Sequence, residues 1–228
     1  MKKSEVRRTH YDNGNIRSEE YCVECKCHRE DGPAYIQYYE NGNIECEKYC
    51  INNEYHRENG PATIGYYEDG SVKCERYYIN GKLHNNDLPA VICYYNDGCV
   101  KSKCYYINNI CYRENKPAYI EYYNDYNHSK MVEMYYNNNG KAHKEDGPAI
   151  ISYRLHNNNC IKYKTYYING CEYNYEYDKY KNNLTERMIK INKDIDILKI
   201  MKIVCIENNN KELLDLVENK IITLQLSK

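Results

Sequence analysis

The stretch His28-Arg-Glu-Asp-Gly-Pro-Ala34 decides the fold of this chain, because variants of it recur along the sequence. The copies occupy residues 28–34, 56–62, 84–90, 112–118 and 143–149, so neighbouring copies are 28 residues apart until the last, which follows after 31. A fixed period of this length is typical of a repeat array, in which each unit buries a face against its neighbours. Such arrays mostly present surfaces to partners, and few of them catalyse reactions.

One repeat, residues 61–88, predicts two reversals of the chain. Residues 62–67 alternate in character with a period of two, which indicates a strand. Asp69-Gly70 tolerates the positive φ of a tight hairpin, residues 72–79 form the return strand, and Asn80-Gly81 makes a second turn. The chain must therefore double back twice in every repeat, as it does in an antiparallel meander.

We therefore predict a mostly β fold: an elongated antiparallel meander of about five 28-residue hairpin repeats in a single-layer sheet, with a small C-terminal α-helical cap. Residues 1–27 are a truncated opening half-repeat. Residues 28–172 are the hairpin array, with units starting near residues 28, 56, 84, 112 and 143. Residues 173–228 hold a final strand and a two-helix cap.

Stacking the units aligns two columns on the first strand of each repeat. One column is constant, with Ala34, Ile36, Tyr38 and their equivalents, and we predict that it forms the core face. The other column varies between units, and variation on a constant scaffold is typical of a binding surface. The predicted binding surface consists of Tyr35, Gln37, Tyr39, Thr63, Tyr67, Val91, Tyr95, Tyr119 and Tyr123.

The pattern changes after Gly170. Residues 173–177 alternate tyrosine with polar residues, which predicts a last strand. Apolar residues then step by three and four over 188–198 and again over 213–224, and this predicts two helices separated by Asn208-Asn-Asn210. We expect these helices to cap the open end of the sheet. The alternative is self-association, in which their apolar faces pair with a second copy of the chain.

The composition disfavours several classes of protein. The net charge is −1 with 29% charged residues, which leaves no basic excess for binding nucleic acid. Rows of tyrosine could stack bases, but without that charge most of the phosphate attraction is lost. The first residues show no signal peptide, and no apolar stretch approaches the length of a membrane span. We expect a cytoplasmic protein with no transmembrane segment that is not secreted.

Thirteen cysteines raise the question of a disulfide framework or a metal site. Because there is no export signal and the number is odd, we interpret them as reduced cysteines that act as small buried hydrophobes. Cys22, Cys25, Cys27 and His28 form the one local cluster of zinc-type ligands. Their repeat equivalents include tyrosine, asparagine and leucine, so we expect ordinary repeat positions, and neither a metal nor another cofactor.

A register of histidines at 28, 56, 84 and 143 is the other candidate for chemistry. A histidine could serve as a general base, but no serine, cysteine or paired carboxylate recurs at a spacing that would complete a catalytic set. We therefore predict a structural corner, in which the histidine or the arginine after it bonds turn carbonyls or a carboxylate of the next unit. No enzymatic activity is expected.

The recurrent Tyr-Tyr-x-Asn-Gly turns, such as residues 77–81, resemble MORN repeats, and more closely the antitoxin-type MORN variants of bacteria. The Asp-Gly-Pro-Ala and His-Arg-Glu additions, with the bias to Tyr and Asn, look like repeat proteins of large AT-rich DNA viruses of amoebae. The resemblance covers about residues 8–172, with a longer period than the standard repeat. It implies a single-layer sheet of hairpins for protein or membrane attachment, and it implies no catalytic residues.

One function and two alternatives are expected from these observations. We expect a non-enzymatic scaffold that binds a protein partner through one sheet face, with tyrosines as contacts because they bury much area at small entropic cost. One alternative is a structural or self-assembling component of a viral particle or factory, located in the virion or the host cytoplasm. The other alternative is an antitoxin or immunity protein.

Overall fold

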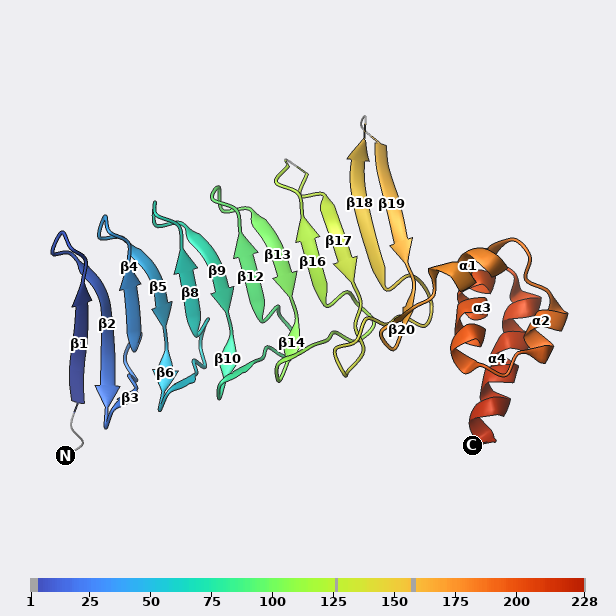
Figure 1. The fold of residues 1–228 in the computed structure, drawn as a ribbon, viewed down its shortest axis with the longest axis horizontal. Helices are drawn as coiled ribbons and strands as arrows, with labels where there is room; N and C mark the ends of the chain where they lie inside the picture. Colours follow the sequence, from blue (N-terminus) through green and yellow to red (C-terminus); the bar gives the residue numbers. More distant parts are fainter. Residues whose placement is uncertain (1–3, 126, 157–158, 228) are drawn as a thin grey trace. The chain divides into compact units, whose positions relative to one another are not determined.

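The computed structural model describes residues 4–125, 127–156 and 159–227. The fold is mostly β, with an antiparallel meander sheet followed by helices at the C-terminal end (Figure 1). The predicted fold class is therefore confirmed. The chain divides into two compact units, one formed by residues 1–111 and 118–130 and the other by residues 112–117 and 131–228.

Long hairpins build the sheet, and the order of their strands follows the order in the chain. Because each strand pairs with the next one antiparallel, few connections have to cross the sheet. The strands are β1 (Ser4–His10), β2 (Ile16–Val23), β4 (Tyr35–Tyr38), β5 (Ile44–Lys48), β8 (Thr63–Tyr66), β9 (Val72–Arg76), β12 (Val91–Tyr94), β13 (Val100–Cys104), β16 (Tyr119–Tyr122), β17 (Lys130–Met134), β18 (Ile150–His156) and β19 (Asn159–Thr165).

A short hairpin of two-residue strands follows most of the long ones. In the first unit its strands are β6 (Cys50–Ile51) with β7 (Glu54–Tyr55), β10 (Tyr78–Ile79) with β11 (Lys82–Leu83), and β14 (Tyr106–Ile107) with β15 (Ile110–Cys111), while β3 (Lys26–Cys27) pairs with β2. In the second unit β20 (Tyr167–Ile168) pairs with β21 (Cys171–Glu172). In the fourth repeat the short hairpin is reduced to a bridge between Tyr136 and Ala142.

Both predicted turns of the repeat are confirmed. In the long hairpin, the Gly70 N–H donates to the Tyr67 carbonyl at 2.9 Å, and Gly70 has φ +87°. A positive φ at this point lets the return strand leave the turn with the twist that the hairpin needs. In the short hairpin, Asn80 and Gly81 have φ values of 49° and 72°, which is the two-residue turn that Asn-Gly favours.

The constant column is buried at its alanines and at Ile120, which is 7% exposed. Ala34, Ala62, Ala90, Ala118 and Ala149 are each 0% exposed. They lie where one repeat meets the next, as when the Tyr49 N–H donates to the Ala62 carbonyl at 2.8 Å. A larger side chain at this point would push two repeats apart, which explains why the residue after the proline is always alanine.

Apart from Ile120, the isoleucines and tyrosines of the predicted core face in the first unit are not fully buried. Ile36 and Tyr38 are only half-buried, and Ile36 lies directly opposite Glu19 and Glu47 on the neighbouring strands. Isoleucines and carboxylates alternate across this face because the sheet of the first unit has no second layer to cover it. The Tyr38 hydroxyl donates to the Glu19 carboxylate at 3.0 Å, which satisfies a buried charge.

Tyrosine hydroxyls join each repeat to the next. In four of the long hairpins the tyrosine at the start of the turn donates to the carbonyl of a tyrosine 27 residues further along the chain. The donors and acceptors are Tyr11 with Tyr38 at 2.7 Å, and Tyr39 with Tyr66, Tyr67 with Tyr94 and Tyr95 with Tyr122 at 2.8 Å each. Phenylalanine could not make these bonds, so the bias of the composition towards tyrosine has a structural cause.

The arginine and glycine of the repeated phrase pack against each other. Arg29 lies 4.1 Å from the ring centre of Tyr21, and its guanidinium donates to the Pro33 carbonyl at 3.4 Å. A Cβ on Gly32 would approach the Arg29 guanidinium carbon to 3.0 Å. The arginine therefore packs closely over the glycine, and the same arrangement recurs with Arg57 and Gly60.

The histidine register forms the predicted corner, with one change in its bonding. Each histidine Nδ1 accepts the backbone N–H of a short-hairpin turn in the next repeat, and the histidine therefore bonds an amide group and not a carbonyl. The pairs are His28 with Asn52, His56 with Asn80, His84 with Asn108 and His143 with Asn169, at 3.1–3.3 Å.

Two sequence predictions for the C-terminal region are wrong in detail. Residues 173–177, predicted as a strand, begin α1 (Asn174–Lys181), because the Tyr177 ring stacks on Tyr166 at 3.9 Å and a helix brings it there. The first predicted helix is divided into α2 (Glu186–Ile191) and α3 (Ile195–Glu207). Asp194 starts α3 by accepting the N–H groups of Asp196 and Ile197.

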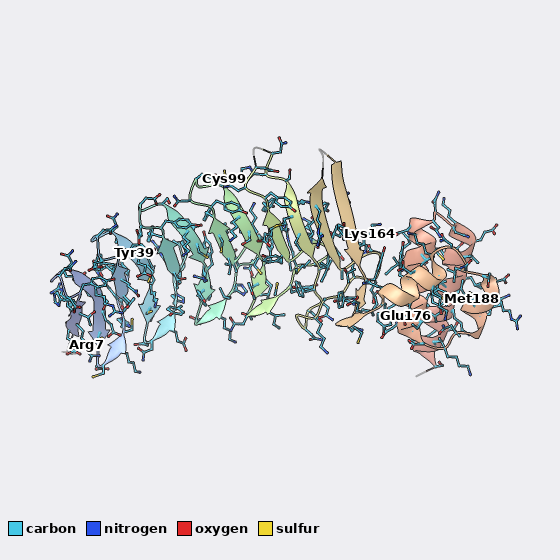
Figure 2. All side chains as sticks on the ribbon, turned by 45° about the horizontal axis from the view of Figure 1, so that its top comes forward. Arg7, Tyr39, Cys99, Lys164, Glu176 and Met188 are labelled. Carbon is cyan, nitrogen blue, oxygen red and sulfur yellow. The ribbon has the colours of Figure 1, made fainter. Side chains whose placement is uncertain are left out.

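The second predicted helix is confirmed as α4 (Lys211–Leu226), which Asn210 caps. The buried apolar cluster of the second unit lies here and includes Ile168 of β20, Leu198, Met201 and Val217. Lys164 of β19 bonds Glu207 of α3 at 2.8 Å and points towards the helices in Figure 2. The helices therefore pack on the last repeat, as the capping prediction required.

Tyr67→Phe should lower the free energy of unfolding by about 1 kcal/mol, because it removes one bond between repeats and leaves the Tyr94 carbonyl without that donor. Urea unfolding of the full chain, followed by circular dichroism, measures this effect. The matched control is Tyr163→Phe, in a side chain that is 49% exposed. A shift of equal size in both variants would contradict a structural role for the Tyr67 hydroxyl.

His143→Asn should make the stability less dependent on pH. Burial lowers the pKa of the His143 imidazole, against the attraction of Glu145 and together with the repulsion of Lys199. The neutral imidazole therefore stabilises the folded state. Its contribution to the free energy of unfolding is fully present above about pH 6.5, the ordinary imidazole pKa, and is lost as the pH falls through the lowered pKa. An asparagine oxygen can still accept the Asn169 N–H but does not titrate. The urea midpoint of unfolding is measured for the wild type and for His143→Asn between about pH 7 and pH 5. An equal fall of the midpoint in the two proteins would contradict a contribution of His143 to the pH dependence.

Candidate functional site

The predicted binding surface lies in the first unit, on the face of the sheet opposite the isoleucines. At its centre, small side chains lie directly opposite one another on five successive strands from β5 to β13. We call them the small-residue row: Cys46, Gly65, Cys74, Cys93 and Ser102. Gln37 precedes the row and Glu121 follows it. These side chains are short, and all but Cys74, which is 6% exposed, are half-buried.

Four basic side chains border the small-residue row, and we call them the cationic flanks. Lys48 and Arg76 stand at the ends of β5 and β9, away from the long-hairpin turns. Lys73 and Lys101 stand near the turns, where they lie 5.5 and 5.8 Å from the ring centres of Tyr67 and Tyr95. Within the described residues none of the four forms an ion pair, so their charge is available to a ligand.

The acidic groups at the margins of this face are already engaged. The Gln37 amide donates to Glu45 at 2.6 Å, and the Tyr119 hydroxyl donates to Glu121 at 3.1 Å. Burial, reinforced by the Glu121 charge, raises the pKa of Tyr119 to about 12, so its hydroxyl stays a donor at neutral pH. The centre of the face is therefore basic, although the chain as a whole is not.

Some of the predicted surface residues are on this face, where the Tyr35 hydroxyl donates to Gln37 at 3.2 Å and Lys48 lies 4.5 Å from the Tyr35 ring centre. Tyr35, Gln37, Val91 and Tyr119 are half-buried and belong to first strands. Thr63 is on the same face but is 9% exposed, and its hydroxyl lacks a hydrogen-bond partner within the described residues.

The turn tyrosines of the predicted surface have a different role. The hydroxyl groups of Tyr39, Tyr67 and Tyr95 donate the hydrogen bonds between repeats. Figure 2 shows Tyr39 at the turn end of its hairpin. Tyr123 also begins a turn, where its N–H donates to the Ser129 carbonyl. These residues hold the array together, and the sequence could not separate this role from binding.

The binding surface predicted from the sequence did not include the cationic flanks. The return strands change from Glu45 and Glu47 in one repeat to Lys73 and then Lys101 in the next two, and this drift was the available signal. It could not be interpreted without the register, which shows that Lys48 and Arg76 lie beside the same row of small residues.

Two grooves also lie beside the histidine corners. One groove of about 1010 Å³ is lined by Arg29, Tyr49, His56 and Arg57, among others. In the second unit a groove of about 600 Å³ includes His143. Their basic groups already have partners, since Arg29 pairs with Asp31 at 2.8 Å and stacks on tyrosine.

The corner histidines are poorly placed to act as bases. His28 and His143 accept a backbone N–H at Nδ1, and their Nε2 atoms lie 3.6 and 3.7 Å from Glu30 and Glu145. In the neutral ring this arrangement puts the proton on Nε2, facing the carboxylate. Neither nitrogen then keeps a free lone pair for abstracting a proton.

The zinc-type cluster is dispersed by the fold. Cys22 is buried in β2 and lies opposite Cys27, whereas Cys25 is exposed at the turn with φ +63°. His28 uses Nδ1 for the Asn52 N–H. Throughout the described ranges, no three histidine, cysteine or acidic side chains are grouped so that they could hold a metal ion.

No described helix combines the length and the low polarity that crossing a lipid bilayer requires. In comparisons with known proteins, no family model matches this chain, and no curated protein matches it either.

Proposed function

We propose that this protein is a non-enzymatic, MORN-like scaffold that binds an extended acidic segment of a protein partner across the strands of its first unit. The observation that supports the proposal is the small-residue row between the cationic flanks. A row of short side chains provides a track in which a partner's backbone can approach the sheet, and unpaired cations on both sides favour carboxylates.

The dimensions of the row suit a short peptide. Neighbouring strands are about 4.8 Å apart, so the row from Cys46 to Ser102 measures about 19 Å. An extended segment of about six residues has this length. Tyr35 and Tyr119 stand on the same face towards either end and offer aromatic contacts to side chains of the segment.

A protein partner is favoured over nucleic acid by the balance of charge. Four basic residues over about 19 Å can pair with a few carboxylates, but the chain carries a net charge of −1. Binding to a polyphosphate depends on releasing counterions along a continuous basic surface, and Glu45 and Glu121 interrupt it here.

Arg76→Gln with Lys101→Gln should weaken binding of a fluorescent Glu-rich peptide about tenfold, because each lost ion pair at an exposed site contributes up to about 1 kcal/mol. Fluorescence anisotropy at low salt measures this. The matched control is Lys26→Gln with Lys82→Gln, which removes the same charge from exposed short hairpins. Equal weakening in both double variants, no peptide binding by the wild type, or tighter binding of a single-stranded oligonucleotide would contradict the proposal.

Gly65→Phe should abolish peptide binding and leave the fold intact. A Cβ at Gly65 would meet no atom closer than the Cys74 carbonyl oxygen at 4.0 Å, so the backbone accepts a side chain there. The aromatic ring would then fill the row, and aromatic residues are well tolerated in strands. Anisotropy with the same peptide tests binding, and circular dichroism with a urea titration tests the fold. Unchanged affinity in a folded variant would place the binding site elsewhere.

A further inference from the structure

Two cysteines of the small-residue row are in contact across a repeat boundary. Cys74 is on β9 of one repeat and Cys93 is on β12 of the next, and the two residues lie directly opposite each other. Their sulfur atoms are 3.0 Å apart. Another close pair, Cys104 and Cys111, is 3.5 Å apart and lies within a single repeat.

The backbone around Cys74 and Cys93 already meets the requirements of a disulfide. Residues directly opposite on antiparallel strands have Cα atoms about 4.5–5.5 Å apart, which is within the range that disulfides span. The sulfur atoms would have to move only about 1 Å closer to form a bond.

The two thiols differ in ways that suit successive steps of one reaction. Cys93 is half-buried and can be reached from solvent, whereas Cys74 is 6% exposed. The hydrogen bond from Cys74, with help from Ser102 and the charges of Arg76 and Lys101, lowers the pKa of the Cys93 thiol. The thiolate is the reactive form of cysteine, so Cys93 is the side chain that meets an oxidant first.

We propose that Cys74 and Cys93 are a site of reversible oxidation, at which a small disulfide such as oxidised glutathione creates a covalent link between consecutive repeats. The Cys93 thiolate attacks one sulfur of oxidised glutathione, and the first glutathione leaves as a thiolate and takes up a proton. Cys74 then loses its proton and attacks the Cys93 sulfur of the mixed disulfide, which releases the second glutathione. Two protein thiols are oxidised, and one glutathione disulfide is reduced to two thiols.

The link would act on the stability of the array. It closes a loop of chain between β9 and β12 and so restricts the unfolded state more than the folded one. It also draws together the side chains at the centre of the small-residue row. The assignment rests on the geometry of the two thiols and does not depend on the proposed binding function.

The test uses the full-length wild-type protein, treated in its native state with oxidised glutathione. Remaining thiols are then blocked with iodoacetamide, and peptides are mapped by mass spectrometry without reduction. We expect one cross-linked peptide pair joining Cys74 to Cys93, with alkylation at both residues reduced about tenfold and restored by dithiothreitol. The oxidised protein should also unfold at a higher urea concentration.

Variants distinguish the order of the steps. Cys74→Ser should leave Cys93 carrying one glutathione, and Cys93→Ser should leave Cys74 unmodified, because the first attacking thiol is gone. The matched control, Cys104→Ser, should still form the link between Cys74 and Cys93. The proposal is overturned if the oxidised wild type carries both residues as separately alkylated peptides, or if either is joined to a different cysteine.

Discussion

The sheet of the first unit has a single layer, and this constraint governs the rest of its structure. Among its described residues no second sheet or helix covers this face, and Ile36, Ile64 and Ile92 stay half-buried, so apolar burial between layers contributes little here. Stability must come from contacts between consecutive repeats. Buried alanines allow close approach, tyrosine hydroxyls and histidine nitrogens bond groups in the next repeat, and arginines stack on tyrosine rings.

The same constraint explains why the repeated phrase tolerates so little change. His56 bonds the next turn, Arg57 packs closely over Gly60, and Ala62 lies at the joint. Where the glycine becomes Leu88, the position of the arginine is also changed to asparagine, and Leu88 is 65% exposed. In the fourth copy, however, the glycine becomes Lys116 while Arg113 is kept, so the two positions do not always change together. Because the residues of the phrase carry the structural contacts, the opposite face remains available for binding.

Much of the fold could be predicted because its signals are local. The turns at Asp69-Gly70 and Asn80-Gly81 depend on residues that accept positive φ, and the α4 helix depends on a regular apolar step. The predictions failed where distant contacts overrode a local pattern. Residues 173–177 alternate like a strand, yet Tyr177 stacks on Tyr166 in a helix. The Tyr177 hydroxyl donates to Glu207, which also accepts a hydrogen bond from Lys164. These partners are distant in sequence, so no local period reports them.

The sequence by itself determined the repeat and its two turns, since each of these depends on residues within one period. Only the tertiary structure decided which tyrosines bond the next repeat and which lie on the face of the small-residue row. It also decided that Lys48 and Arg76 border the same row as Cys74, and that Cys74 meets Cys93. The physical reason is strand register: side chains from different repeats become neighbours across hydrogen-bonded strands, and a shift of one residue would send each of them to the opposite face.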